Sequence, residues 1–223
     1  MRYALARRWL PSGLRRFLYS FEALIEDSVS ALAGGLPAGA RVLDAGAGEG
    51  QYSEHFRRQR YTGVDLGIGD AAWSYARLDA IADLTALPFR AGTFDAALSI
   101  VTLEHLRDPL AALRETARVL APGGVLLLVA PMEWEVHQAP HDYFRYTRHG
   151  LEYLLRESGL RVEELQPAGG IFRLLARRLL NASQLQPWLL PLLGPLALLL
   201  GLLDGLDRRK DSTLGYKCIA RKL

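Results

Sequence analysis

Sulfur is scarce in this sequence, whose 223 residues include one cysteine, Cys218, and two methionines. A single cysteine cannot form an intrachain disulfide, which is typical of proteins that work in a reducing compartment. The N-terminal residues also lack an uninterrupted apolar run long enough for a secretory signal and a clear cleavage site. We therefore expect a cytoplasmic protein.

A large excess of one charge is also lacking. The 27 lysines and arginines exceed the 24 acids by only three, which does not predict a nucleic-acid partner. The basic residues are unevenly placed, however, because five arginines precede the first acid, Glu22: Arg2, Arg7, Arg8, Arg15 and Arg16. This basic N-terminus is either a solvated helix face or a contact with an anionic membrane surface.

Half of the residues are hydrophobic, which is enough for a globular core. Apolar and turn patterns predict an α/β fold in which strands alternate with helices, as in a mostly parallel sheet. The expected strands are 41–44, 61–65, 78–83, 94–101, 125–130, 162–165 and 216–220. The expected helices are 14–33, 51–58, 109–120 and 147–158, with a turn at 122–124.

We expect one domain over residues 1–223. An amphipathic helical region occupies residues 1–38, and the α/β core follows over residues 39–167. An apolar helical insertion then covers residues 168–213, before a last strand within residues 214–223.

A glycine-rich turn follows the first strand. That strand ends at Asp44, and Gly46, Gly48 and Gly50 let the backbone turn tightly and approach a ligand. Dinucleotide-binding folds also have such turns, but they place a pyrophosphate there. Asp44 and Glu49 would repel a pyrophosphate and would attract a cationic ligand. The turn therefore predicts a cofactor that carries an ammonium group.

Further acids end the next two expected strands. Asp65 lies at the end of the second strand, where a carboxylate can accept hydrogen bonds from both hydroxyls of a ribose. Asp83 ends the third strand and could accept a hydrogen bond from an adenine amine.

At this point the chain resembles the class I S-adenosylmethionine-dependent methyltransferases, in the type 11 methyltransferase-domain family. The resemblance rests on an ordered set of motifs that covers roughly residues 40–131: 42–52, 64–65, 83–89, 93–97, 103–106 and 118–124. It implies a Rossmann-like sheet of seven strands with an antiparallel last strand. It also implies that the glycine turn holds the methionine part of the cofactor, while Asp65 holds the ribose and Asp83 the adenine. The expected cofactor-binding residues are Asp44, Gly46, Gly48, Gly50, Tyr52, Asp65, Leu66, Asp83, Leu84 and Ile100.

The loop after the fifth strand is rich in polar and aromatic residues. Its His141 and Glu133 are the expected bases, because that loop lies beyond the carboxyl end of a parallel strand. Residues 141–147, His-Asp-Tyr-Phe-Arg-Tyr-Thr, resemble a segment in a bacterial subset of these enzymes whose substrates are usually unknown or glycan-associated. The expected acceptor contacts are His137, Asp142, Tyr143, Arg145 and Tyr146. The alternative is a structural loop in which Arg145 pairs with Asp142.

A metal site is not expected in this loop. His137 and His141 have the spacing of a metal-binding pair, but the sequence supplies no convincing third ligand and Pro140 interrupts a helix there.

The most unusual stretch has no charged residue from Leu179 to Leu203. Pro191, Gly194 and Pro195 should break it, which favours two short helices on a membrane surface or on the protein over one spanning helix. Residues 185–206 and the basic N-terminus then predict contact with a membrane, and a lipid-linked acceptor such as a quinone or a polyprenyl-linked glycan. The alternatives are a homodimer interface or a lid packed on the domain.

These observations predict an S-adenosylmethionine-dependent methyltransferase that acts on a small or lipid-linked acceptor at the inner face of the cytoplasmic membrane. The alternative is a non-catalytic binding module of the same fold, peripheral to a membrane biosynthetic complex. An NAD-dependent reductase is disfavoured by the acids around the glycine turn.

Overall fold

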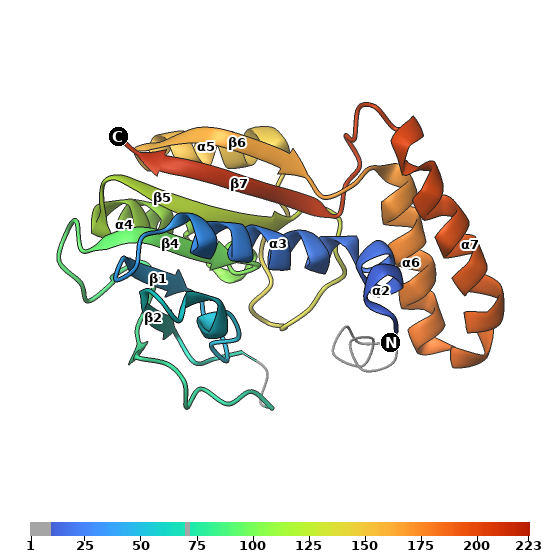
Figure 1. The fold of residues 1–223 in the computed structure, drawn as a ribbon, viewed down its shortest axis with the longest axis horizontal. Helices are drawn as coiled ribbons and strands as arrows, with labels where there is room; N and C mark the ends of the chain where they lie inside the picture. Colours follow the sequence, from blue (N-terminus) through green and yellow to red (C-terminus); the bar gives the residue numbers. More distant parts are fainter. Residues whose placement is uncertain (1–9, 70–71) are drawn as a thin grey trace.

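A seven-stranded sheet runs through the computed structural model, which describes residues 10–69 and 72–223. The expected contributions of Arg2, Arg7 and Arg8 lie outside the described residues. The strand order is β3-β2-β1-β4-β5-β7-β6, and only β7 runs antiparallel to its neighbours (Figure 1). The strands are β1 (Arg41–Ala45), β2 (Arg60–Asp65), β3 (Ala80–Ile81), β4 (Phe94–Ile100), β5 (Leu120–Pro131), β6 (Leu160–Pro167) and β7 (Gly215–Lys222). The expected Rossmann-like sheet with an antiparallel last strand is confirmed.

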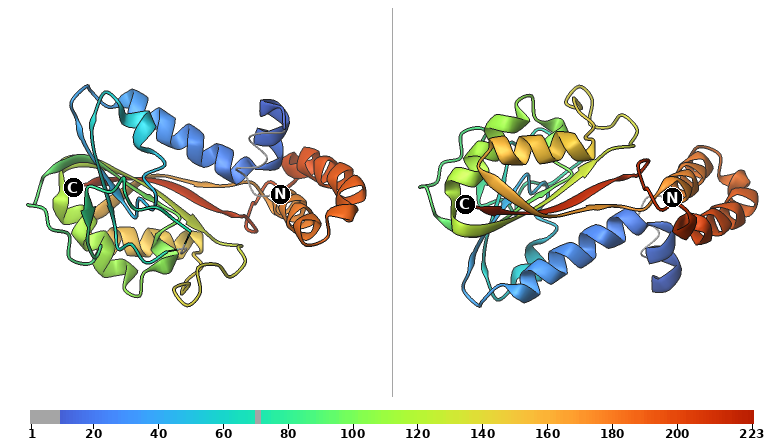
Figure 2. Two further views of the ribbon diagram at one scale, coloured as in Figure 1. Left: turned by 90° about the horizontal axis from the view of Figure 1, so that it is seen from below. Right: turned by 90° about the horizontal axis from the view of Figure 1, so that it is seen from above.

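Helices cover both faces of the sheet (Figure 2). The apolar run of β5 alternates between two cores, with Leu126 and Leu128 in one and Leu127 and Val129 in the other. Helices α4 (Pro109–Val119) and α5 (Arg148–Glu157) pack on the first face, and α3 (Ser20–Gly35) packs on the second. A strand buried on both faces has no polar side, which explains its continuous apolar sequence.

The ends of α4 and α5 follow the expected capping chemistry. The Asp108 carboxylate accepts from the Ala111 amide, and Pro109 opens α4, where a missing amide costs nothing. The Thr147 hydroxyl accepts from the Gly150 amide at the start of α5. Gly159 then ends that helix with φ +81°.

Two expected elements of the core are shorter than predicted. The expected helix 51–58 is only the short 3₁₀ turn η1 (Ser53–Phe56). The Gln59 amide group reaches back to the carbonyls of Ala33 and Leu36, so the chain must turn into β2 within a few residues. The expected strand 78–83 is reduced to β3, because the Asp79 carboxylate accepts from Gly63 in place of a backbone carbonyl.

The expected helix 14–33 is two helices, α2 (Ser12–Leu18) and α3. They are separated at Tyr19, whose φ and ψ of −110° and 55° are not helical. Its side chain is buried, with the Arg177 guanidinium 4.9 Å from the ring centroid. The expected turn at 122–124 is instead an irregularity within β5, where the pairing with β4 shifts between Phe94 and Ala96.

Along the chain, helices α6 (Ile171–Leu185) and α7 (Leu190–Leu202) connect β6 to β7. The connection also contains the 3₁₀ turns η3 (Pro187–Leu189) and η4 (Leu203–Leu206). Together with α2 they form a separate helical layer beyond the end of the sheet (Figures 1 and 2). The break between the two helices falls near Gln186, earlier than expected. Pro191 lies in the first turn of α7, and the amide that Pro195 lacks would have bonded to the carbonyl of Pro191. In the described part of the chain, none of the helices is both long and apolar enough to cross a bilayer.

Candidate active site

A cavity of about 400 Å³ opens at the carboxyl ends of β1, β2 and β4. This is the edge at which open α/β sheets bind ligands. Ten of the residues expected from the sequence line it: Gly46, Gly48, Tyr52, Asp65, Leu66, Asp83, Leu84, Ile100, His137 and His141. The cavity therefore joins the expected cofactor residues to two histidines of the expected acceptor loop.

The glycine turn is held against the end of β4. Gly46 has φ +90°, and a Cβ built on it would lie 2.2 Å from Cγ2 of Thr102. Gly48 also has a positive φ, and its amide donates to Asp65 Oδ2 at 2.9 Å. Val101, beside Thr102, has φ 53°, a strained value for a β-branched residue. The turn therefore packs so closely against Thr102 that only glycine fits at position 46.

Asp44 and Gly50, which were also expected to bind the cofactor, do not line the cavity. Asp44 lies fully buried at the end of β1 and accepts a 2.5 Å hydrogen bond from the Tyr61 hydroxyl. Its Oδ1 finds no hydrogen-bond partner among the described residues. Burial raises the pKa of Asp44 to about 7. Gly50, with φ +71°, turns the chain out of the loop.

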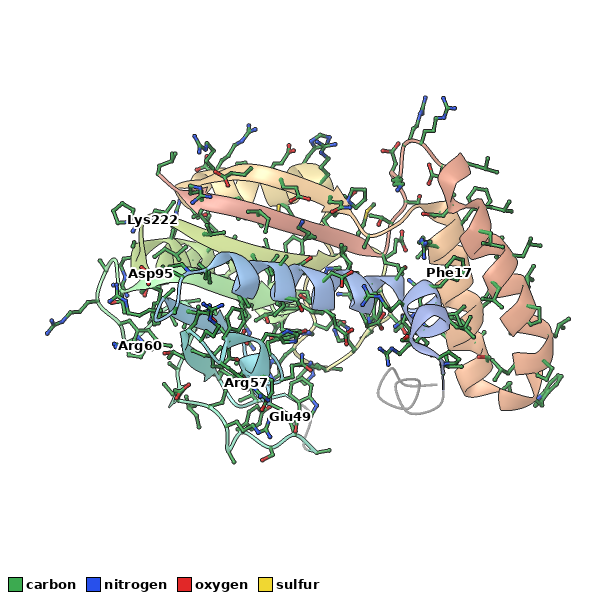
Figure 3. All side chains as sticks on the ribbon, viewed as in Figure 1. Phe17, Glu49, Arg57, Arg60, Asp95 and Lys222 are labelled. Carbon is green, nitrogen blue, oxygen red and sulfur yellow. The ribbon has the colours of Figure 1, made fainter. Side chains whose placement is uncertain are left out.

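The other two acids face the cavity from neighbouring strand ends. Asp65 accepts hydrogen bonds from the amides of Gly48 and Gly67, at 2.9 and 2.8 Å. Asp83 accepts from the amide and the hydroxyl of Thr85, both on Oδ1. Carboxylates that are fixed by the backbone in this way are pre-organised to accept further hydrogen bonds from a ligand. Glu49, labelled in Figure 3, also lines the cavity and accepts from the Ser74 amide.

On the acceptor side, five expected residues do not line the cavity: Glu133, Asp142, Tyr143, Arg145 and Tyr146. Arg145 forms two bonds with Asp142, at 2.5 and 2.8 Å, and donates to the carbonyls of Trp134 and Glu135. This guanidinium holds the pKa of Asp142 well below its usual range. Tyr146 donates to the Leu103 carbonyl. These side chains therefore fasten the loop, as in the structural alternative.

Glu104 and His105, which lie close to His137, were not among the expected site residues. Glu104 is fully buried, and burial raises its pKa to about 8. Its Oε1 lies 3.7 Å from His105 Nε2 and 3.8 Å from His137 Nε2. The sequence signal was present, because Leu-Glu-His-Leu directly follows the carboxyl end of β4, where residues reach the ligand edge.

The N-terminal helix also contributes to the site in a way that its amphipathic pattern did not reveal. Phe21, Glu22 and Ile25 of α3 line the cavity together with Trp134. Arg177 of α6 forms two hydrogen bonds with Glu22, at 2.8 and 2.5 Å, and lies 4.9 Å from the centroid of the Trp134 ring. Helix α6 thus supports the wall of the cavity from behind.

The acidic side chains in and beside the cavity fit S-adenosylmethionine. The fully buried Oδ1 of Asp44 has no hydrogen-bond donor among the described residues, and this carboxyl lies at the start of the glycine turn that lines the cavity. Asp65 and Asp83 present carboxylates at the next two strand ends. A sulfonium and an ammonium suit the first region, and the hydroxyls and amine of an adenosine suit the second.

Known proteins are similar to this chain in sequence and in fold. A model of the methyltransferase domain matches residues 15–165. The ubiquinone biosynthesis O-methyltransferase of Xanthomonas oryzae pv. oryzae (strain PXO99A) is 37% identical over 139 residues, which are 56% of this chain and 56% of that protein. The chain thus spans little more than half the length of this curated relative.

Two solved structures have a similar fold. The cyclase SpnF superimposes with a TM-score of 0.60 at 23% identity, covering 88% of this chain and 80% of its own. The 1,6-didemethyltoxoflavin-N1-methyltransferase of Burkholderia thailandensis, solved with S-adenosylhomocysteine, has a TM-score of 0.56 at 20% identity, covering 87% and 76%. Because the matched residues 15–165 are more than half of the sequence, this chain belongs to the methyltransferase-domain family of S-adenosyl-L-methionine-dependent enzymes.

Proposed function

We propose that this protein methylates an oxygen of a small, lipid-like acceptor. The observation that carries the proposal is that one cavity joins the acid-flanked glycine turn to apolar side chains and histidines. Phe21, Ile25, Leu106 and Trp134 supply the apolar wall. The name of the Xanthomonas relative, an O-methyltransferase of ubiquinone biosynthesis, supports oxygen as the methylated atom and a lipid-like acceptor.

The cofactor supplies an activated methyl group on a positively charged sulfur. The chain's own residues then have to bind and align. Asp65 and Asp83 accept hydrogen bonds from the ribose and adenine, and Asp44 favours positive charge beneath the glycine turn. Holding the acceptor atom in line supplies much of the rate, so the walls of the cavity matter as much as any base.

A histidine is the favoured proton acceptor for the hydroxyl of the substrate, because its pKa lies close to neutral. His141 and His137 both line the cavity, and His141 Nδ1 lies 3.0 Å from the Tyr143 hydroxyl. Glu133 lies outside the cavity wall, 3.8 Å from Arg178. The geometry therefore favours His141 over Glu133 of the two expected bases.

The test has a binding part and a turnover part. Calorimetry should detect binding of S-adenosylmethionine and S-adenosylhomocysteine but not of NAD, and Asp65→Ala should abolish it. Mass spectrometry should then detect a methyl ether on a polyprenylated phenol, with less product from the same phenol without its tail. Binding without methylation of either phenol would favour the non-catalytic module, and binding of NAD alone would overturn both readings.

We further propose that this acceptor is reached at the inner face of the cytoplasmic membrane, through the outer side of α7 and η4. Five exposed leucines there are spaced three or four residues apart and so share one helix face: Leu192, Leu196, Leu199, Leu202 and Leu206. Trp188, at the turn between the helices, is 73% exposed. Arg208 and Arg209 follow and are exposed, which suits anionic lipid headgroups. The alternative occupant of this face is a second copy of the chain.

A further inference from the structure

Three side chains converge on one point at the acceptor side of the cavity. Glu104 and His105 belong to the short 3₁₀ turn η2 (Leu103–His105) after β4, and His137 comes from the loop after β5. One ligand atom from each lies within 4.8 Å of the other two. Because Glu104 is fully buried, this is an interior cluster and not a surface group of polar residues.

Both histidines present the same nitrogen to Glu104. His105 Nδ1 lies 2.5 Å from the His141 carbonyl oxygen, and His137 Nδ1 lies 3.1 Å from that of Glu135. A carbonyl can only accept a hydrogen bond, so each Nδ1 carries a proton, and in the neutral imidazole each Nε2 then keeps a lone pair. This is the tautomer found in metal-binding histidines whose second nitrogen is held by the protein.

The centre of the cluster lacks a donor. Neither oxygen of Glu104 accepts a hydrogen bond from any residue in the ranges 10–69 and 72–223, and the same holds for His105 Nε2 as a donor or acceptor. The nearest other charges, Asp142 and Arg145, are bonded to each other. Because no described group donates to these buried oxygens, a cation could take the place of the missing partner.

The distances suit a shared ion better than direct bonds. At 3.7 and 3.8 Å, the two Glu104–histidine contacts are too long for hydrogen bonds. Zinc bonds of about 2.0–2.2 Å in tetrahedral geometry place neighbouring ligand atoms about 3.4 Å apart. Each Glu104–histidine distance would have to shorten by a few tenths of an ångström around an ion, and the ligand atoms of the two histidines lie within 4.8 Å of each other.

We propose that Glu104, His105 and His137 bind a divalent transition-metal ion of the zinc class. Two imidazoles and one carboxylate are the protein ligands of many zinc sites that keep an open position. His105 and His137 line the cavity, so the open position faces the space in which the acceptor is expected. Water or an oxygen of the acceptor can take that position. This inference goes beyond the proposed methyl transfer and does not depend on it, although the sequence alone had led us to expect no metal.

The test measures metal binding alone, without cofactor or acceptor. The full chain, freed of metal by a chelator, is titrated with Zn²⁺ by calorimetry and with Co²⁺ by visible absorption, which reports four-coordinate geometry. We expect about one ion per chain at saturation. Glu104→Gln, which keeps the shape of the side chain, and His137→Gln should each weaken binding more than about 100-fold, since loss of a second-shell partner alone costs about 10–100-fold.

Two matched controls separate this cluster from other histidines. His149, which is exposed on α5, should be replaceable by glutamine without effect on the affinity. His141→Gln tests the His137–His141 spacing, from which no metal site was expected, and should leave the absorption of bound Co²⁺ in place. Binding of S-adenosylhomocysteine by each variant reports folding independently. Absence of a tight ion, or equal affinity in the wild type, Glu104→Gln and His137→Gln proteins, would overturn the proposal whether or not the protein methylates a substrate.

Discussion

Gly46 is the residue at which a single methyl group should do most damage to cofactor binding. Its φ of +90° disfavours any other residue, and an added Cβ would lie 2.2 and 2.4 Å from two atoms of the Thr102 side chain. Gly46→Ala must therefore displace either the glycine turn or the end of β4. We expect loss of detectable S-adenosylhomocysteine binding in calorimetry.

Gly39 is the matched control for this substitution. Its φ is +80°, but no described atom lies within 4 Å of an added Cβ. Gly39→Ala thus carries similar backbone strain, of about 1 kcal/mol, without the collision. It should lower the melting temperature slightly and leave the affinity unchanged. Equal loss of affinity in both variants would show that strain, and not contact with Thr102, is responsible.

Asp44 should make cofactor binding depend on pH. Burial raises its pKa to about 7, so the carboxyl of the free protein is largely protonated below that pH. A bound cation favours the carboxylate, and binding at pH 6 should therefore release a proton. The affinity for S-adenosylmethionine should rise as the pH passes upward through about 7. Calorimetry in two buffers of different ionisation enthalpy measures the released proton.

Asp44→Asn supplies the control, because an amide cannot titrate. Its binding should be weaker and should release no proton from this site. The same pKa affects stability without cofactor. In the unfolded chain Asp44 ionises near its ordinary value of 3.8, whereas in the folded chain it stays protonated to about 7. Its contribution to the free energy of unfolding therefore falls as pH rises between these values, and Asp44→Asn should remove that slope.

At the residue scale, the sequence predicts the functional side chains that follow the carboxyl ends of parallel strands. Asp65 and Asp83 could be placed because parallel strands bring their carboxyl ends to one edge. For Asp142 and Arg145 the sequence leaves two roles open, contact with the acceptor or pairing with each other, and only the folded loop shows that they pair. The position of Glu22 beside Arg177 joins residues far apart in the chain, and no local pattern encodes such a contact.

At the element scale, strands β1, β2, β4 and β5 and helices α4 and α5 follow from apolar runs and caps. The failures are elements whose ends are set by tertiary contacts. Tyr19 divides the N-terminal helix where its buried ring meets Arg177, and Gln59 shortens the helix after the glycine turn. Propensity over a short window cannot anticipate such contacts.

Arg177 should be the main attachment of helix α6 to the core. It is buried, bonds twice to Glu22 and lies over the rings of Tyr19 and Trp134. Arg177→Met keeps an apolar stem but leaves Glu22 unpaired, which should reduce the free energy of unfolding by about 3 kcal/mol. Urea unfolding measures that loss, and hydrogen exchange should become faster in α6.

The next residue along α6 provides the comparison. Arg178 bonds to Glu135 with both side chains partly exposed, at 36% and 49%. Arg178→Met should cost less than about 1 kcal/mol, as is usual for a surface ion pair. Similar losses in the two variants would mean that burial of the Arg177–Glu22 pair does not anchor the helix.

For the molecule as a whole, the helical layer of α2, α6 and α7 is joined to both the core and the cavity. Phe17 of α2, labelled in Figure 3, lies against Gly201 of α7, where an added Cβ would be 2.7 Å from its ring. Through Arg177, helix α6 contacts the Glu22 and Trp134 side chains that line the cavity. Binding of this layer to a lipid surface would therefore bring the cavity close to that surface.

The last prediction concerns the exposed face of α7. Leu192 and Leu202 are 69% and 72% exposed, so replacing both with serine removes apolar surface without opening the core. In flotation with vesicles that contain anionic lipid, the wild type should rise with the lipid and Leu192→Ser/Leu202→Ser should stay behind. Ile81→Ser/Val136→Ser is the matched control, because these residues are 70% and 79% exposed elsewhere on the protein. High salt should weaken the binding, since Arg208 and Arg209 contribute by charge. If the wild type stays with the unbound protein and sediments as a dimer that the leucine variant loses, this face binds a second copy of the chain instead of a membrane.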